Sequence, residues 1–239
     1  VDKVVSDTDL KARDALIYLQ KHNFDETFLS KLLSVGTLGI KKNRKLVPTR
    51  WSITAADDTL GKNLIDEIKH YSESGHNLFF GSYLGNYYLI LLFPDVWGYE
   101  LFETYLPNVS WNVTKEIQYT TDYEPYKGRK YYAENCAGGY YTVRLAVSEY
   151  LKRIKRQASV LAIRVITGEY AAPLGVWVTR EATRKAMNNK PLDFSSKELM
   201  LEYARKLINQ KFGCSIDKIL KESLLLKELS QQKKLVNFI

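Results

Sequence analysis

Cysteine, histidine and long apolar runs are scarce in this chain of 239 residues. Its cysteines are Cys136 and Cys214, so a disulfide framework is excluded and we expect no zinc site within the chain. No apolar run approaches the ~20 residues of a membrane-spanning helix, and no charged-then-apolar leader opens the sequence. We therefore expect a cytoplasmic protein with no membrane partner.

Acidic residues are outnumbered by basic ones. The chain has 35 Lys and Arg against 27 Asp and Glu, a formal net charge of +8 and a sequence pI of about 9.2. Much of the excess lies in two blocks, at residues 41–45 and 152–156. A clustered positive charge favours polyanionic partners such as DNA, although each block is equally consistent with a solvated surface.

The spacing of apolar residues predicts a mixture of helices and strands. Two aromatic and β-branched runs around Gly85-Asn86 predict a β-hairpin, and other patterns predict strands at 100–105, 115–123, 159–167 and 176–178. Helices are expected at 8–20, 24–33, 143–154, 179–188, 196–211 and 216–230. We expect an α+β fold, with a mostly antiparallel central sheet and peripheral helices. Residues 1–230 would form one domain, followed by a flexible C-terminal tail at 231–239.

The tail has the spacing of a sliding-clamp-binding motif, in which a glutamine, an aliphatic residue and a pair of large apolar residues are separated by fixed intervals. These positions are Gln232, Leu235, Phe238 and Ile239. Three-residue spacing places Leu235 and Phe238 on one side of a 3₁₀ turn, where they form an apolar plug. The alternative is that they extend the preceding helix and pack on the domain.

The segment around Pro48 carries a dense group of polar and aromatic residues. Pro48 predicts an extended segment over 46–54, and Asp57 or Asp58 would cap the helix that follows. As a site, Arg50 would bind a phosphate, Trp51 would stack on a base beside Ser52, and an aspartate would act as a base or hold a cation. The alternative is a capped helix with Trp51 in the core.

A second candidate site precedes the helix at 143–154. Gly138 and Gly139 would let the backbone approach a phosphate, with Glu134 and Asn135 beside it. Cys136, near a helix start, would have a lowered thiol pKa and act as a nucleophile. The alternative for this segment is a plain tight turn.

Three blocks of sequence together resemble the archaeal Nre family of DNA repair proteins. They are residues 46–64 with the run LVPTRWSITAADDTLGKNL, residues 134–147 with ENCAGGYY and RLAV, and the C-terminal tail. The resemblance implies a role in DNA repair coupled to the archaeal sliding clamp PCNA. It does not imply a particular reaction or cofactor, and the cysteine-rich part that family members usually carry is absent from these residues.

The remaining candidates would contact DNA along a basic, aromatic surface. On the helix at 143–154 they are Arg144, Lys152 and Lys155. Base stacking is also possible for a group of tyrosines, which would otherwise pack in the core: Tyr119, Tyr123, Tyr126, Tyr131, Tyr132, Tyr140 and Tyr141.

Two rival functions remain open. One is an enzyme acting on DNA ends or a nucleotide, in a pocket formed jointly by the Arg50/Asp58 and Glu134/Gly139 segments, with Asp57, Asp58 and Glu134 as catalytic groups. The other is a non-catalytic repair adaptor.

Overall fold

A computed structural model describes residues 1–231 of the protein. The positions predicted to bind a sliding clamp, Gln232, Leu235, Phe238 and Ile239, lie outside the described residues. The chain divides into two compact units, at residues 1–67 and 68–239, and each is considered separately below. Whether they fold as one domain is a separate question, so the expectation of a single domain over 1–230 stays a prediction.

Unit 1 is helical. Its elements are α1 (Asp2–Ser6), α2 (Ala12–Lys21), α3 (Glu26–Ser34), the 3₁₀ turn η1 (Lys41–Asn43) and α4 (Thr49–Ile68), which ends at the unit boundary. Arg44, from the first basic block, donates hydrogen bonds to the carbonyl oxygens of Gly39, Val5 and Asp7, at 2.6, 2.8 and 2.6 Å. Arg44 therefore holds the loops of this unit together.

The prediction of an extended segment over 46–54 is wrong. The carbonyl of Pro48 accepts hydrogen bonds from the amides of Trp51 and Ser52, at 2.9 and 3.1 Å, and α4 runs without a break from Thr49. Proline is favoured at the start of a helix, because its missing N–H would have no partner there and its fixed φ suits the first turn. Asp57 and Asp58 therefore lie in the middle of α4 and do not cap it.

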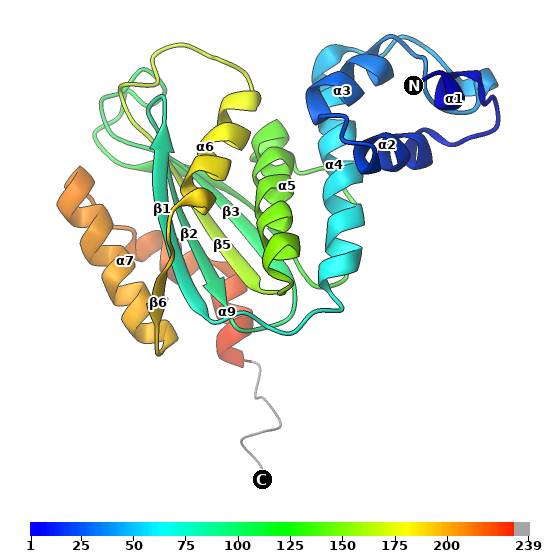
Figure 1. Ribbon diagram of the computed structural model, residues 1–239. Coiled ribbons are helices and arrows are strands. Elements are labelled where there is room, and N and C mark those ends of the chain that lie inside the picture. The colour runs from blue at the N-terminus through cyan, green and yellow to red at the C-terminus, as the bar shows by residue number, and fades with distance from the viewer. Residues whose placement is uncertain (232–239) are drawn as a thin grey trace. The chain divides into compact units, whose positions relative to one another are not determined.

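Unit 2 is built on a six-stranded sheet (Figure 1). Its strands, with the order β4-β3-β5-β2-β1-β6, are β1 (His76–Tyr83), β2 (Asn86–Phe93), β3 (Gly98–Tyr105), β4 (Gln118–Glu124), β5 (Ser159–Ile166) and β6 (Leu192–Phe194). The β3–β5 pair is parallel and the other neighbours are antiparallel. The predicted α+β fold with a mostly antiparallel sheet is confirmed.

The predicted hairpin is confirmed as β1 and β2. Leu84 and Gly85 both have positive φ, 47° and 72°, which matches the twist of the paired strands. A Cβ on Gly85 would lie 2.4 Å from the amide nitrogen of Tyr170, so this position also requires the close approach that glycine allows.

Helices cover both faces of the sheet (Figure 1). One face carries α5 (Ala137–Ile154) and α6 (Trp177–Asn188). The other carries α7 (Lys197–Phe212), α8 (Asp217–Glu222) and α9 (Leu224–Gln231), whose apolar side chains pack with those of β2 and β5. Residues 176–178 start α6 and do not form the predicted strand, and the predicted helix over 216–230 is divided at Ser223. None of the helices in residues 1–231 is long and apolar enough to span a membrane.

Candidate functional site

The Arg50 group lies at the start of α4 in unit 1. Arg50 is exposed and Trp51 is 63% exposed, so the tryptophan does not belong to the core. Ser52 is buried, and its hydroxyl donates to the carbonyl of Thr49 at 2.9 Å. Arg50 and Trp51 are therefore available to a ligand, whereas the Ser52 hydroxyl is engaged with its own helix.

The two aspartates of α4 have different surroundings. Asp57 is fully buried. Asp58 pairs with Lys62 one helical turn later, at 2.7 Å. Their proposed roles as base or cation ligand are not tested by this geometry and stay predictions.

The segment Glu134–Gly139 lies in unit 2, at the start of α5. Glu134 and Asn135 are exposed, and the Asn135 amide donates to the carbonyl of Thr121 at 2.9 Å. A Cβ on Gly139 would lie 2.5 Å from Oε1 of Glu103, and one on Gly138 would lie 2.7 Å from Cγ1 of Val176. Both glycines thus allow close packing within the protein. The joint pocket with the Arg50/Asp58 segment would involve both units and stays a prediction.

Cys136 does not have the environment of a nucleophile. It is buried, and its backbone amide donates to Oδ2 of Asp122 at 2.8 Å. Burial, with the nearby Glu103 carboxylate, raises the pKa of the thiol to about 12. The lowered pKa expected from the helix start is wrong, because desolvation and a carboxylate outweigh the helix dipole.

A buried layer of ion pairs lies between the sheet and helices α5 and α6. Glu103 on β3 accepts from Arg164 on β5 at 2.6 Å, and Glu124 on β4 accepts from Arg144 on α5 at 2.6 Å. Glu124 also accepts from Trp97 Nε1 at 3.0 Å and from the Tyr140 hydroxyl at 2.9 Å. Since each of these charges has an oppositely charged partner on another element, the layer fixes α5 on the sheet.

The prediction that Arg144 lies on an exposed, DNA-facing surface is therefore wrong. It is 1% exposed and is held by Glu124. Sequence reasoning missed this layer, although one signal was present: Arg164 is the single charged residue in the otherwise apolar run of β5. An isolated charge in a fully buried strand requires a buried partner.

The loop between β4 and α5 is held in place by Arg129. Its guanidinium pairs with Asp122 at 2.9 Å and donates to the carbonyls of Tyr123 and Tyr132, at 2.9 and 3.1 Å. Because Asp122 also accepts from the amide of Cys136, one carboxylate ties both ends of the loop. The loop backbone is thus well ordered without burying its tip.

The tip of this loop exposes aromatic and basic side chains together. Tyr126, Tyr131 and Tyr132 are 45%, 83% and 49% exposed, and Lys127 and Lys130 are exposed between them. We call residues 126–132 the tyrosine–lysine loop. The Gly128 amide donates a hydrogen bond to the Pro125 carbonyl at 2.8 Å, which closes a turn where the chain leaves β4.

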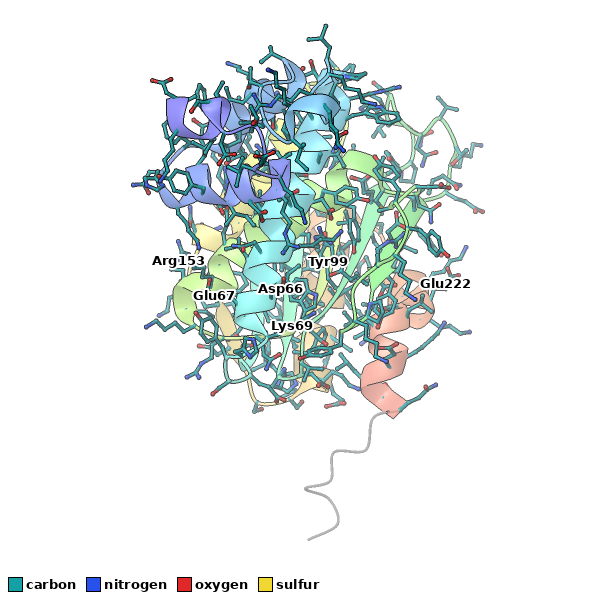
Figure 2. All side chains as sticks on the ribbon, turned by 90° about the vertical axis from the view of Figure 1, so that its right-hand side faces the viewer. Asp66, Glu67, Lys69, Tyr99, Arg153 and Glu222 are labelled. Carbon is teal, nitrogen blue, oxygen red and sulfur yellow. The ribbon has the colours of Figure 1, made fainter. Side chains whose placement is uncertain are left out.

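The other predicted tyrosines are engaged elsewhere. Tyr119 donates to Glu222 at 2.6 Å, Tyr123 donates to Glu228, and Tyr140 is buried. Figure 2 shows Glu222 in the helical layer of α8 and α9 and Tyr99 away from that layer. The hydroxyl of Tyr99 donates to the carbonyl of Tyr140 in α5. The structure thereby divides the tyrosine group into packed and exposed members.

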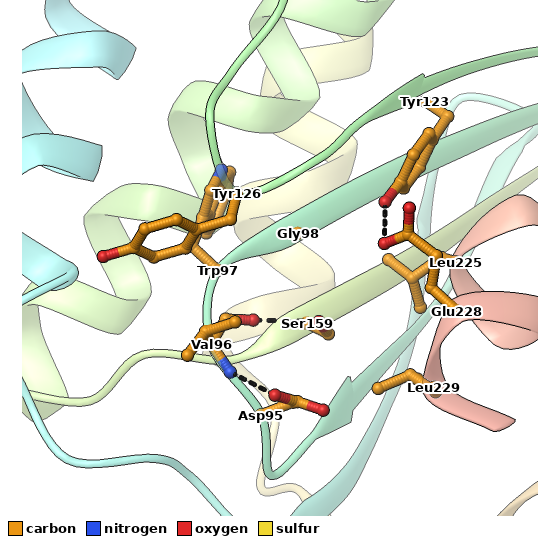
Figure 3. A pocket seen from close by; sticks show the side chains of 10 residues that line it. All are labelled: Asp95, Val96, Trp97, Gly98, Tyr123, Tyr126, Ser159, Leu225, Glu228 and Leu229. Atoms are coloured by element: carbon orange, nitrogen blue, oxygen red, sulfur yellow. Dashed lines mark hydrogen bonds between the residues drawn. The ribbon is translucent and has the colours of Figure 1, made fainter. Parts of the chain in front are cut away.

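The second basic block lies at the same end of the sheet as Tyr126. Lys152, Arg153, Lys155 and Arg156 are all exposed at the end of α5. Gln157, the next residue, accepts from the amide of Trp97 at 3.2 Å. Trp97 and Tyr126 line the same small cavity of about 30 Å³ (Figure 3), which has room for only one or two water molecules. The surface at this end of the sheet therefore includes both segments.

Lys69 adds a cation to this surface (Figure 2). Its Nζ lies 4.7 Å from the centre of the Tyr126 ring, within the range of a cation–π interaction. Among residues 1–231, no group of three or more His, Cys, Asp or Glu side chains is placed to hold a metal ion.

Comparison with known proteins assigns most of the chain to two segments of one family. Residues 1–112 match the model described as archaeal Nre, N-terminal, and residues 124–238 match archaeal Nre, C-terminal. No solved structure is significantly similar to the chain.

Three characterised relatives are named DNA repair proteins. NreB of Archaeoglobus fulgidus is 42% identical over 219 residues, which are 91% of this chain and 55% of that protein. NreA of the same organism is 42% identical over 212 residues, with 88% and 54% covered. NreA of Haloferax volcanii is 40% identical over 196 residues, with 81% and 47% covered. The chain thus spans about half the length of these relatives. It belongs to the archaeal Nre family.

Proposed function

We propose that this protein acts in DNA repair and contacts DNA through the tyrosine–lysine loop and the basic end of α5. The observation that carries the proposal is the joint exposure of Tyr126, Tyr131, Lys127 and Lys130 on a loop tied down by Arg129. The names of the relatives support the repair role. Lysines attract the phosphates, and aromatic rings offer contact to bases.

The surface is suited to DNA because several of its lysines are not neutralised by a carboxylate within the part of the chain that the structure describes. The described residues show no ion pair between Lys127, Lys130 or Lys155 and a carboxylate. Other surface cations do have carboxylate partners, such as Lys206 with Glu202 at 2.6 Å and Arg205 with Asp217 at 2.8 Å. Arg50 and Trp51 on α4 are proposed as additional contacts.

The test is the salt dependence of DNA binding, measured by fluorescence anisotropy. Replacing Lys127 and Lys130 together with Gln should weaken binding and make the slope of log K against log salt shallower by about 1.5, since each lost phosphate contact removes about 0.7–0.9. A Lys152→Gln/Lys155→Gln variant should behave in the same way. A Lys206→Gln/Lys218→Gln variant, altered on α7 and α8 across the sheet, is the matched control. If all three variants bind as the unaltered protein does, the proposed surface is wrong.

We also propose that the C-terminal tail recruits the protein to the archaeal sliding clamp PCNA. The support is the spacing of Gln232, Leu235, Phe238 and Ile239 in the sequence. Two large apolar side chains close to a chain end are suited to an apolar pocket on a partner.

Calorimetric titration with the clamp tests recruitment. The full chain should bind with a Kd near micromolar, about −8 kcal/mol, and a version truncated after Ser230 should not bind. A Leu235→Ala/Phe238→Ala variant should also lose binding, whereas Lys233→Ala should change it by about twofold at most. Equal binding by the full and truncated chains would rule out tail-directed recruitment.

A further inference from the structure

We propose that the tyrosine–lysine loop binds single-stranded DNA, by stacking unpaired bases on the ring of Tyr131. This inference rests on the proposed contact between the loop and DNA. It adds the kind of DNA that the loop would select and the residue that would select it.

The first observation is the free ring of Tyr131. Its side chain is 83% exposed, the highest value among the exposed aromatic residues of the described chain, and no ring contact involves it there. An aromatic side chain exposed to this degree has no packing role in the fold. Its flat faces are open to another ring system, such as a base.

The second observation is that the loop is already ordered. The Tyr131 carbonyl accepts from Arg129 Nε at 3.4 Å, and the next residue, Tyr132, is held more firmly. The ring of Tyr132 stacks on that of Tyr141, with centres 5.4 Å apart and planes 30° apart. The Tyr141 hydroxyl in turn accepts from the amide of Ala133 at 2.9 Å. Little conformational entropy would therefore be lost when Tyr131 meets a base.

The third observation is the place of the lysines. Lys130 is adjacent to Tyr131, and Lys127 lies across the Gly128 turn, where a Cβ on Gly128 would meet nothing within 4 Å. The turn thus lies in open space, so a nucleic acid backbone can approach both lysines. The lysines can therefore contact the phosphates of the same strand whose bases stack on the ring.

Duplex DNA cannot stack its bases on the ring of Tyr131. In a duplex, the faces of the bases are covered by their neighbours and only the edges are accessible in the grooves. A stacking tyrosine can bind only bases that are already unpaired or at a frayed end, whereas the lysines bind phosphates of either form. The ring therefore selects for single strands and the lysines do not.

The experiment compares oligonucleotides with matched variants of the full chain. A thymidine oligonucleotide of about 12 nucleotides, its RNA counterpart and a duplex of the same length are titrated by anisotropy. Tyr131→Ala should weaken binding to the single-stranded DNA by about 5- to 100-fold and change duplex binding by less than about twofold. Tyr131→Phe should retain the unaltered affinity, because it retains the ring. Tyr203→Ala, which removes a 40% exposed tyrosine of α7, is the control.

A direct readout of stacking comes from Tyr131→Trp. The protein already contains four tryptophans, among them the proposed contact Trp51, so the signal is the difference between this variant and the unaltered protein. The thymidine oligonucleotide should quench this added fluorescence, and the duplex should not.

The outcomes separate the two proposals. If the unaltered protein binds neither single-stranded nor duplex DNA, the proposed DNA contact fails, and the present inference fails with it. If it binds DNA but Tyr131→Ala has no selective effect on the single strand, only the stacking inference is overturned. Tighter binding of the RNA counterpart than of the DNA would overturn the assignment to DNA.

Discussion

Lys155 has an unusual backbone conformation for a residue with a side chain. It caps the C-terminal end of α5 in the left-handed region, with φ 52°, and the amide of Arg156 donates to the Leu151 carbonyl at 3.0 Å. Glycine is the common residue at this position of a helix end, because a Cβ there is strained. A lysine that persists at such a position is consistent with the role in DNA contact proposed for it.

Lys155→Gly should therefore stabilise the fold and weaken DNA binding. Relief of the left-handed strain should raise the free energy of unfolding by about 0.5–1 kcal/mol, measured by urea denaturation. Asn23→Gly is the control, since Asn23 also has positive φ, 63°, and asparagine tolerates that region well. A gain in both stability and DNA affinity would contradict the proposed role of Lys155.

The pKa of Cys136 predicts how the stability of the protein changes at alkaline pH. The folded pKa, about 12, lies above the ordinary value of 9.0, so folding favours the thiol over the thiolate. The resulting stabilisation is fully present below about pH 9 and is lost as the pH rises toward 12. Cys136→Ala should show a smaller loss of unfolding free energy across this range than the unaltered protein.

Labelling with iodoacetamide provides a second measurement of the same property. At pH 8 the native protein should react at the half-exposed Cys214 before the buried Cys136. In urea, both should react. Preferential labelling of Cys136 in the native state would contradict the assigned environment.

At the scale of elements, helix α9 is capped by a residue distant in sequence. The buried carboxylate of Glu100 on β3 accepts from the Ser223 hydroxyl and from the amides of Leu224 and Leu225, both at 3.1 Å. Burial raises the pKa of Glu100, although the hydrogen bonds from Ser223, Leu224 and Leu225 act in the opposite direction. The helix that precedes residues 232–239 is thus held by strand β3.

Removing this cap should loosen α9. Glu100→Ala leaves buried donors without an acceptor, and the loss of unfolding free energy should be about 1–3 kcal/mol, measured by urea denaturation. Hydrogen exchange of the α9 amides should rise more than that of β5. Glu228→Gln, which alters a contact at the surface of α9, is the control and should have a smaller effect. Equal exchange in α9 and β5 would indicate global destabilisation instead.

At the scale of the whole molecule, the two family segments interlock in one sheet. Strands β1, β2 and β3 belong to residues 1–112, whereas β5 and β6 belong to residues 124–238. Strand β4 (Gln118–Glu124) lies almost wholly between the two segments. Strand β5 lies between β3 and β2 and pairs with both along its full length, residues 159–166. The two segments are therefore one structural unit in this region, although sequence comparison treats them separately.

Residues 68–112 and 113–239, the two parts of unit 2, should consequently fail to fold when each is produced alone. Neither fragment can form the centre of the sheet, so circular dichroism should show no cooperative thermal unfolding for either. When mixed, they should regain a cooperative transition. Residues 68–239, which contain the whole sheet, are the matched fragment and should unfold cooperatively. A stable, independently folded 68–112 fragment would contradict the interlocked sheet.

Local patterns in the sequence determined much of the fold. Some features depend only on residues that are close together in the sequence. They are the hairpin turn at Gly85, the strands at 98–105 and 159–166, and the three blocks that identify the family. The positive net charge likewise follows from composition. The wrong prediction at Pro48 arose because proline suits both an extended segment and the first turn of a helix, and only the hydrogen bonds to its carbonyl distinguish them.

Tertiary structure alone decided which of the functional candidates are accessible. Arg144 and Lys152 lie on the same helix, yet Arg144 is paired with Glu124 inside the protein and Lys152 is at the surface. Likewise, Tyr140 is buried beside that pair, whereas Tyr131 projects into solvent. Burial and ion pairing depend on residues brought together from distant strands, so no local pattern specifies them. The physical reason is that a charged or aromatic side chain can make either a buried contact within the protein or a contact with a ligand. Neighbours that are distant in sequence determine which of the two contacts it makes.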